Sequence, residues 1–346
     1  MSDTVEFGLD TFGDVTFDGA GRLKSQAQTL RDVVAEAVLA DQAGIDAFGV
    51  GEHHRNDFAI SAPEVVLAAI AGRTEKLVLG SAVTVLSTDD PVRVFLRFST
   101  LNAVSNGRAE VILGRGSFTE SYPLFGYDLT RYEELFEDKL RMFAELLKSG
   151  PATWSGSTRS AITSQVIYPP IETGVLRTWV GVGGSPESVV RAARHGLPLT
   201  LAIIGGSPHR FRPYVDLYYE SLGRFGKSVQ PVAVHSPGYV AATDDQAKAE
   251  LWPHYEKMIG RIGAERGWPP PTRAQFDRET GPDGALCVGS PDTVATKIAN
   301  TIKTLGLSRF DLKYSNGTMP HEQLLKSIEL FGTQVIPRVK EKLSPK

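Results

Sequence analysis

The feature that most constrains the fold of this chain is the regular alternation of short apolar runs with longer helical segments. Eight runs have the composition of buried strands, at 5–10, 47–51, 77–85, 109–114, 179–182, 199–204, 231–242 and 309–314. Segments typical of helices lie between and after them, at 26–43, 63–73, 91–104, 132–147, 186–195, 209–225, 244–266, 290–305 and 320–339. Strands this short and this continuously apolar are typical of parallel sheets that helices cover.

Eight strand–helix units favour an α/β fold of the closed (β/α)₈ type, a TIM barrel, over an open doubly wound sheet. No linker divides the 346 residues, so we predict a single domain over 1–346. Two stretches interrupt the alternation, and we interpret 151–177 as a loop or hairpin insertion and 267–286 as an irregular, mobile one. Insertions at the C-terminal rim of such a barrel shape the substrate pocket, although a plain surface loop is the alternative.

Composition excludes several classes of protein. A net charge of −3 argues against nucleic-acid binding. The start of the chain, MSDTVEFGLD, has no apolar centre like that of a signal peptide. No apolar run approaches the roughly 20 residues that span a bilayer. A single cysteine, Cys287, excludes an intrachain disulfide and fits a reducing compartment. We therefore expect a soluble, cytoplasmic protein with no nucleic-acid or membrane partner.

The segment from Ala109 to Gly126, AEVILGRGSFTESYPLFG, leads from a buried strand straight into a glycine-rich loop. It delivers one guanidinium, that of Arg115, to the end of the strand. Arginine binds phosphate through two parallel hydrogen bonds, and the flanking glycines let a ligand approach the backbone closely. The segment therefore predicts an anionic ligand at Arg115, with a surface arginine in a tight turn as the alternative.

The sequence Gly-Gly-Ser-Pro occurs twice, at 183–186 and 205–208, each time between a strand and a helix. The N-terminus of a helix favours an anion, and plain helix capping by the serine is the alternative. The first copy follows the strand next to that of Arg115. We therefore predict that Gly184, Ser185 and Ser188 converge with Arg115 on one group.

The second strand ends in Gly51-Glu52-His53-His54, which a barrel would place at its catalytic rim. Histidine exchanges protons near neutral pH, and adjacent side chains of a strand point in opposite directions, so only one histidine can face the axis. Further metal ligands at a recognisable spacing are absent, so we predict no metal. There is also no GxSxG element, no Walker A motif and no strand-borne GxGxxG motif.

Three motifs together resemble those of the bacterial luciferase-like flavin monooxygenases, and the likeness runs nearly from end to end. They are GEHH at 51–54, SAVTVL at 81–86 followed by DDPVR at 89–93, and GRGSFTESYPLFG at 114–126. The resemblance implies that FMN binds noncovalently at the C-terminal rim. It implies that Arg115 holds the phosphate together with Gly184, Ser185 and Ser188. It further implies a cis peptide near Ala82–Val83 beneath the flavin ring, and a catalytic His53 beside that ring.

One departure from the family pattern stands before the arginine, where true luciferases often have a reactive cysteine and this chain has Gly114. The missing cysteine argues against light emission. We also expect the small glycine to leave extra space near the flavin. The first hypothesis is a monooxygenase that uses O₂ and reduced FMN from a separate flavin reductase on a small organic molecule. The alternatives are a hydride-transferring enzyme with a deazaflavin coenzyme and a non-catalytic flavin-binding accessory subunit. The resemblance also implies a homodimer, paired through the helices of the second and third units.

Overall fold

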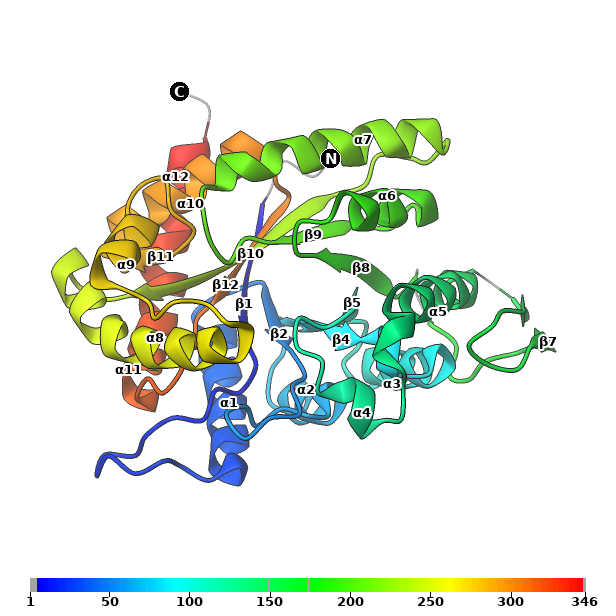
Figure 1. Ribbon diagram of the computed structural model, residues 1–346, viewed down its shortest axis with the longest axis horizontal. Coiled ribbons are helices and arrows are strands. Elements are labelled where there is room, and N and C mark those ends of the chain that lie inside the picture. The colour runs from blue at the N-terminus through cyan, green and yellow to red at the C-terminus, as the bar shows by residue number, and fades with distance from the viewer. Residues whose placement is uncertain (1–4, 149, 173–174, 345–346) are drawn as a thin grey trace.

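Parallel strands form a closed barrel at the centre of the molecule, and helices surround it (Figure 1). The computed structural model describes residues 5–148, 150–172 and 175–344. The closure follows from β10, which pairs with β9 on one side and with β12 on the other, so that eight strands form a ring. In order around the ring they are β1 (Glu6–Thr11), β2 (Ala47–Val50), β3 (Val78–Ser81), β5 (Ala109–Gly114), β8 (Arg177–Val182), β9 (Leu199–Ala202), β10 (Val232–Val240) and β12 (Arg309–Lys313). The predicted (β/α)₈ barrel is confirmed.

The outer helices begin and end where the local sequence favours it. Ser25, Asp90 and Ser290 cap the first turns of α1, α3 and α10 with their side chains, and Gly306 ends α10 in the left-handed conformation. The helices around the barrel are α1 (Gln26–Gln42), α2 (Pro63–Ala71), α3 (Pro91–Val104), α5 (Tyr132–Leu146), α6 (Pro186–His195), α7 (Arg212–Arg224), α10 (Pro291–Leu305), α11 (His321–Leu330) and α12 (Ile336–Leu343). None of the helices in the described ranges is long and apolar enough to span a bilayer.

Two predicted elements prove to be divided. The predicted helix 320–339 consists of α11 and α12, joined by a π-helical turn at Phe331–Val335. The predicted strand 77–85 consists of β3 and β4 (Thr84–Val85), and the peptide bond between Ala82 and Val83 is cis. The resemblance implied a cis bond at this place.

The insertion at 151–177 contains a hairpin, the antiparallel pair β6 (Ala152–Trp154) and β7 (Ile162–Gln165). Its residues 173–174 lie outside the described residues. The insertion connects the end of α5 to the start of β8, so it begins at the N-terminal end of the barrel. Two contacts show that the hairpin then returns along α5. Ser157 donates a hydrogen bond to Glu134 at the start of α5, and Arg159 pairs with Asp90 at the start of α3.

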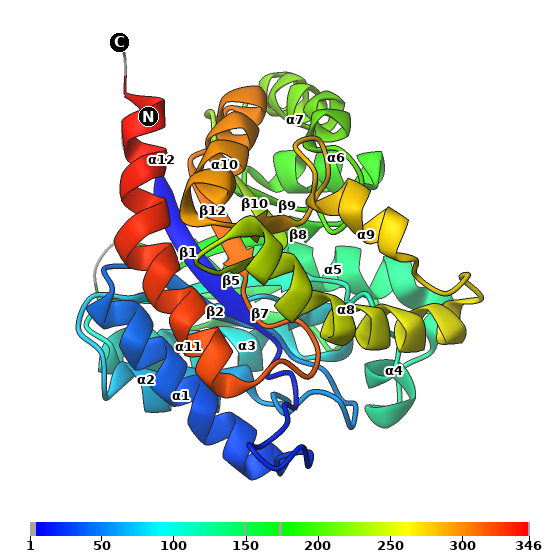
Figure 2. The same cartoon turned by 90° about the vertical axis from the view of Figure 1, so that its left-hand side faces the viewer.

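The segment between β10 and α10 forms a cover at the C-terminal rim. It contains α8 (Asp244–Arg266), α9 (Arg273–Thr280) and β11 (Cys287–Gly289). Strand β11 pairs with β10 of the barrel, and Figure 2 shows α8 and α9 on the same side of the barrel. The prediction that 267–286 is irregular is wrong over α9, which Thr272 and Gln275 start with a reciprocal capping box. The end of α8 is fixed to the β2 loop, since Glu265 pairs with Arg55.

Charged side chains fill the lower part of the barrel, nearer the N-terminal ends of the strands. Arg309 is buried, binds Glu110 and donates from Nε to Asp311 Oδ1 at 2.8 Å. The indole of Trp179 donates to the second oxygen of Glu110 at 3.2 Å. We refer to Arg309, Glu110, Asp311 and Trp179 as the barrel floor.

Candidate functional site

His53 lies in an aromatic pocket at the C-terminal mouth of the barrel. Its ring centre is 4.7 Å from that of Phe12, 4.8 Å from that of Phe58 and 4.9 Å from that of Phe118. The residue is only 7% exposed, and Nδ1 is 3.2 Å from Glu120 Oε1. The geometry therefore gives His53 a fixed ring and a carboxylate partner for one nitrogen.

Glu120 joins the two sequence motifs of the mouth, because it belongs to the arginine loop and contacts both histidines of the second motif. It also accepts the backbone N–H of His54 at 3.3 Å. Although burial opposes the change, the hydrogen bond from His53 lowers the pKa of Glu120. An ionised Glu120 only accepts, so Nδ1 of His53 carries the proton and Nε2 is the nitrogen left for a ligand.

His54 and Glu52 point to other surroundings, as expected for neighbours on an extended segment. The His54 ring packs on Phe125 at 5.0 Å, and burial lowers its pKa. Glu52 accepts the N–H of Val85 at 3.2 Å, while burial, with a contribution from Asp89, raises its pKa to about 8. The described residues hold no group of three or more potential metal ligands.

Ala82 and Val83, on either side of the cis bond, pack at the barrel mouth against a small apolar cluster formed by Ile112, Trp179 and Ala233. Val83 also corrects the interpretation of Gly114 as extra space. A Cβ atom at Gly114 would lie 2.5 Å from Val83 Cγ2, so the methyl group of Val83 already fills the volume that the glycine leaves.

Arg115 lies at the rim after β5, between an aromatic ring and a carboxylate. Its guanidinium carbon is 5.0 Å from the centre of the Tyr132 ring, and Nη1 binds Glu133 Oε1. The second oxygen of Glu133 accepts from Arg191 Nη2 at 2.8 Å, and Arg191 Nη1 donates to Ser188 Oγ at 3.2 Å. Arg115 and Ser188 are therefore connected through Glu133 and Arg191, two residues that the sequence analysis did not single out.

The two Gly-Gly-Ser-Pro copies differ in what meets their backbone. In the first, Ser185 caps α6, and a Cβ atom at Gly183 would meet nothing within 4 Å, which is equally true of Gly205 in the second. In the second, the N–H of Gly206 donates to Glu279 Oε2 of α9 at 3.0 Å. The structure thus leaves the first copy accessible and satisfies the second internally.

A pair that the sequence analysis missed lies at the mouth on the other side of Phe12. His235 Nδ1 is 2.7 Å from Asp10 Oδ2, and the His235 ring stacks on Phe12 at 6.4 Å. Asp10 Oδ1 is buried without a hydrogen-bond partner among the described residues. A charged residue at the end of the first strand and a histidine inside the apolar run VAVHS were the available signals.

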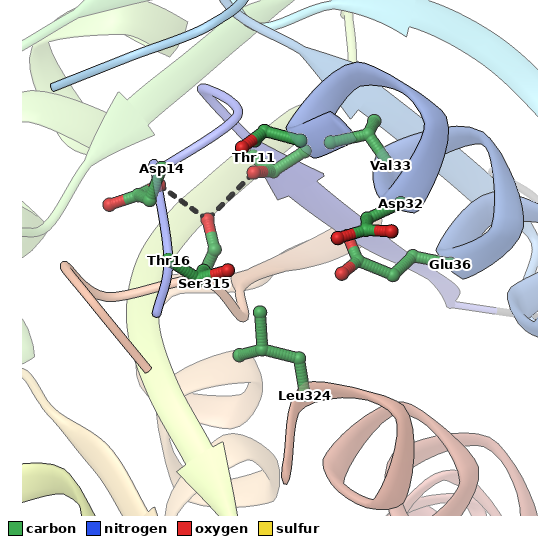
Figure 3. A pocket seen from close by; sticks show the side chains of 9 residues that line it. Thr11, Asp14, Thr16, Asp32, Val33, Glu36, Ser315 and Leu324 are labelled. Atoms are coloured by element: carbon green, nitrogen blue, oxygen red, sulfur yellow. Dashed lines mark hydrogen bonds between the residues drawn. The ribbon is translucent and has the colours of Figure 1, made fainter. Parts of the chain in front are cut away.

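A small polar cavity lies behind the mouth, between the ends of β1 and β12 and helix α1 (Figure 3). Ser315 Oγ bridges Thr11 Oγ1 at 2.7 Å and Asp14 Oδ2 at 2.6 Å along one wall. Its volume of about 10 Å³ is room for one water molecule, so a cofactor cannot bind there.

A family model described as luciferase-like monooxygenase matches residues 11–309. The chain belongs to the luciferase-like monooxygenase family. The alkanal monooxygenase alpha chain of Photorhabdus luminescens is 25% identical over 92% of this chain and 94% of the relative. This family is part of the luciferase-like superfamily of flavin- or F420-dependent oxidoreductases.

Solved structures share the fold over nearly the whole chain. Monooxygenase RslO1 from Streptomyces bottropensis superposes with a TM-score of 0.81 at 21% identity, covering 96% of this chain and 99% of that one. The oxygenating constituent of 3,6-diketocamphane monooxygenase from Pseudomonas putida, in complex with FMN, gives a TM-score of 0.78 at 18% identity, with 97% and 99% covered. The coenzyme F420-dependent tetrahydromethanopterin reductase from Methanopyrus kandleri gives 0.73 at 19% identity, also with 97% and 99% covered.

Proposed function

We propose that this protein is a monooxygenase that uses reduced FMN and O₂ to oxidise a small organic substrate. The observation that carries the proposal is the position of Arg115 beside the open N-terminus of α6, in the same rim as the enclosed imidazole of His53. The guanidinium and the helix N-terminus suit a flavin phosphate, and the enclosed imidazole suits proton transfer near a flavin ring.

The residues at the rim fit a phosphate group. Arg115 offers a guanidinium whose carbon lies 5.0 Å from the centre of the Tyr132 ring. Gly184, Ser185 and Ser188 stand at the first turn of α6, where N–H groups and the helix dipole favour an anion. Because Gly183 leaves open space, a phosphate has access to the backbone there.

The residues at the mouth fit a flat ring and a water-poor reaction. Ala82 and Val83 would lie under the flavin ring, and His53 would hold or move a proton at Nε2 as the catalytic residue. When bound, reduced FMN supplies the electrons that activate O₂. Phe12, Phe58 and Phe118 surround His53 and exclude water, and Arg266 of α8 covers Phe118 at 4.9 Å from the ring centre.

The second candidate is hydride transfer with a deazaflavin coenzyme. The likeness to the F420-dependent reductase of Methanopyrus kandleri favours it, because that fold covers the same strands and mouth. Reduction with a deazaflavin would not consume O₂. A flavin reductase partner and a homodimer through α2 and α3 belong to the proposal for the FMN enzyme, and size-exclusion chromatography tests the dimer.

The decisive experiment combines cofactor identification with oxygen transfer. The purified protein is titrated with FMN and with the deazaflavin, whose absorption spectra differ. It is then loaded with reduced FMN without air and mixed with labelled dioxygen and panels of aldehydes, ketones and sulfonates. We expect FMN binding and label in one class of product. Binding of the deazaflavin alone would favour the second candidate, and flavin binding with no oxygen consumption would indicate an accessory subunit.

A further inference from the structure

The carboxylate of Glu133 occupies the solvent side of the proposed phosphate site. It binds Arg115 with one oxygen and Arg191 with the other. The side chain of Glu133 is 61% exposed, whereas those of Arg115 and Arg191 are 20% and 9% exposed. The carboxylate is thus the most exposed of the three groups, and it bridges the two less exposed guanidinium groups.

The two arginines depend on Glu133 to different degrees. Arg191 also donates from Nε to Glu137 and from Nη1 to Ser188, and it keeps both contacts when Glu133 leaves. Arg115 has no other carboxylate within salt-bridge distance among the described residues. An anion that binds Arg115 bidentately therefore takes the place of Glu133, or shares the guanidinium with it.

A second glutamate holds another of the proposed phosphate ligands. Ser185 Oγ donates to Glu187 Oε2 at 2.8 Å. The neighbouring Glu134 lines the same cleft but differs in its contacts, because its two oxygens accept from Arg131 and Ser157 and not from Arg115, Arg191 or Ser185. Glu133 and Glu187 therefore occupy the phosphate donors, and Glu134 offers a matched carboxylate that does not.

We propose that Glu133 is a built-in competitor of the flavin phosphate, and that it sets the affinity of this protein for the phosphorylated flavin. This inference rests on the proposed function. Like charges near one guanidinium repel, so a phosphate binds Arg115 at the expense of its contact with Glu133. The phosphate then contributes less affinity than it would at a guanidinium without a competing carboxylate. FMN remains exchangeable, as an enzyme needs when its reduced flavin arrives from another protein.

The test compares FMN with riboflavin, which has the same ring and no phosphate. Dissociation constants of both are measured by flavin fluorescence for the wild type, Glu133→Gln, Glu187→Gln and Glu134→Gln. Glutamine keeps the length and one oxygen acceptor of glutamate, and it removes the charge. Thermal unfolding of each variant reports that it is folded.

We expect Glu133→Gln to tighten FMN about tenfold, since one close like charge is removed at a partly exposed site, and to leave riboflavin unchanged. Glu187→Gln is expected to give a smaller gain, because its contact is with a neutral hydroxyl, and Glu134→Gln none. The advantage of Glu133→Gln should shrink as salt is added, because ions screen partly exposed charges.

An unchanged or weaker affinity of Glu133→Gln for FMN would overturn the inference, because Glu133 would then support Arg115 rather than compete for it. An equal gain for riboflavin would overturn it too, since the effect would not involve the phosphate. If Arg115→Ala abolishes the preference of the wild type for FMN while Glu133→Gln changes nothing, the proposed function stands and only this inference fails. If no variant binds either flavin, both fail together.

Discussion

The two ends of the barrel interior treat their buried polar groups in opposite ways. At the floor, Arg309 binds both Glu110 and Asp311, and Trp179 completes the coordination of Glu110. At the mouth, buried atoms of three side chains have no hydrogen-bond partner among the described residues, namely Asp10 Oδ1, His54 Nε2 and Glu120 Oε2. Both ends carry charges. Every charged side chain of the floor is paired, whereas the mouth combines a satisfied pair, Lys313 with Asp14, with the three atoms that have no partner.

This difference separates stability from function within one barrel. A buried charge destabilises the folded protein unless it is paired and hydrogen-bonded. Removing any charged partner from the floor should therefore destabilise the protein. A buried polar atom without a partner costs free energy in the ligand-free state and leaves bonding capacity for a ligand. In such barrels the N-terminal end commonly serves stability and the C-terminal end carries the catalytic residues. The contacts of the floor and of the mouth agree with this division.

The largest effect is expected from breaking the floor with Arg309→Met. Glu110 and Asp311 would keep their burial and lose their common cation, which destabilises a protein by about 3–5 kcal/mol. Urea unfolding measures the change. A loss below about 1 kcal/mol would mean that the floor relaxes or admits water, and the contrast between the two ends would disappear.

At the rim, Arg115→Ala is expected to weaken FMN binding by about 2–3 kcal/mol, because the phosphate loses its charged hydrogen-bond donor. The free energy of unfolding should hardly change, since Arg115 is bound to the exposed Glu133. Titration with FMN and with riboflavin measures the effect, and riboflavin serves as the control. Unchanged FMN affinity would remove Arg115 from the site.

The pH dependence of stability tests the buried carboxyl beside the mouth. The pKa of Glu52 is about 8 in the folded protein, above its ordinary value of 4.5, because the carboxyl is buried. The folded state therefore holds more protons than the unfolded state between these values, and stability falls as pH rises through this window.

Glu52→Gln stays neutral, so it should remove a loss on the order of 3–4 kcal/mol between pH 5 and pH 8. Urea midpoints of the two proteins at both pH values check this. The variant and the wild type should differ least at pH 5. Parallel pH profiles would show that Glu52 is solvated in solution.

His53→Ala should retain FMN and lower the ratio of oxidised product to oxygen consumed by about tenfold, because the site loses the imidazole that holds or moves a proton at Nε2. Hydrogen peroxide and product are measured side by side. His54→Gln is the control, because His54 packs on Phe125 outside the aromatic pocket. Equal coupling in wild type and His53→Ala would contradict the role of His53.

The smallest effect on stability is expected from Asp10→Asn at the mouth. The amide oxygen can still accept from His235, and the unpartnered Oδ1 has no contact to lose, so unfolding should change by less than about 1 kcal/mol. Urea unfolding under the conditions used for Arg309→Met compares the two ends directly. A loss as large as at the floor would show that the mouth is also held by its charges.

Much of this arrangement was predictable because it depends on local signals. Periodicity and caps placed most elements within a few residues, and Ser290 begins α10 as predicted. The motifs at His53 and Arg115 are short, and each follows a strand, so the topology alone brings them to one rim. Helix α9 escaped prediction because its mean composition is polar, and its capping box, Thr272 with Gln275, was the overlooked signal.

The sequence by itself determined the eight repeating units and which strand ends carry an imidazole and a guanidinium, since these depend on residues close by in the chain. Only the tertiary structure decided what each of these groups meets. Glu120 reaches His53 across 67 positions and Asp10 reaches His235 across 225. Glu133, on the helix that follows the arginine loop, binds Arg115, and Val83 fills the space at Gly114. Such pairs form when the ring of strands closes, and no local pattern encodes them.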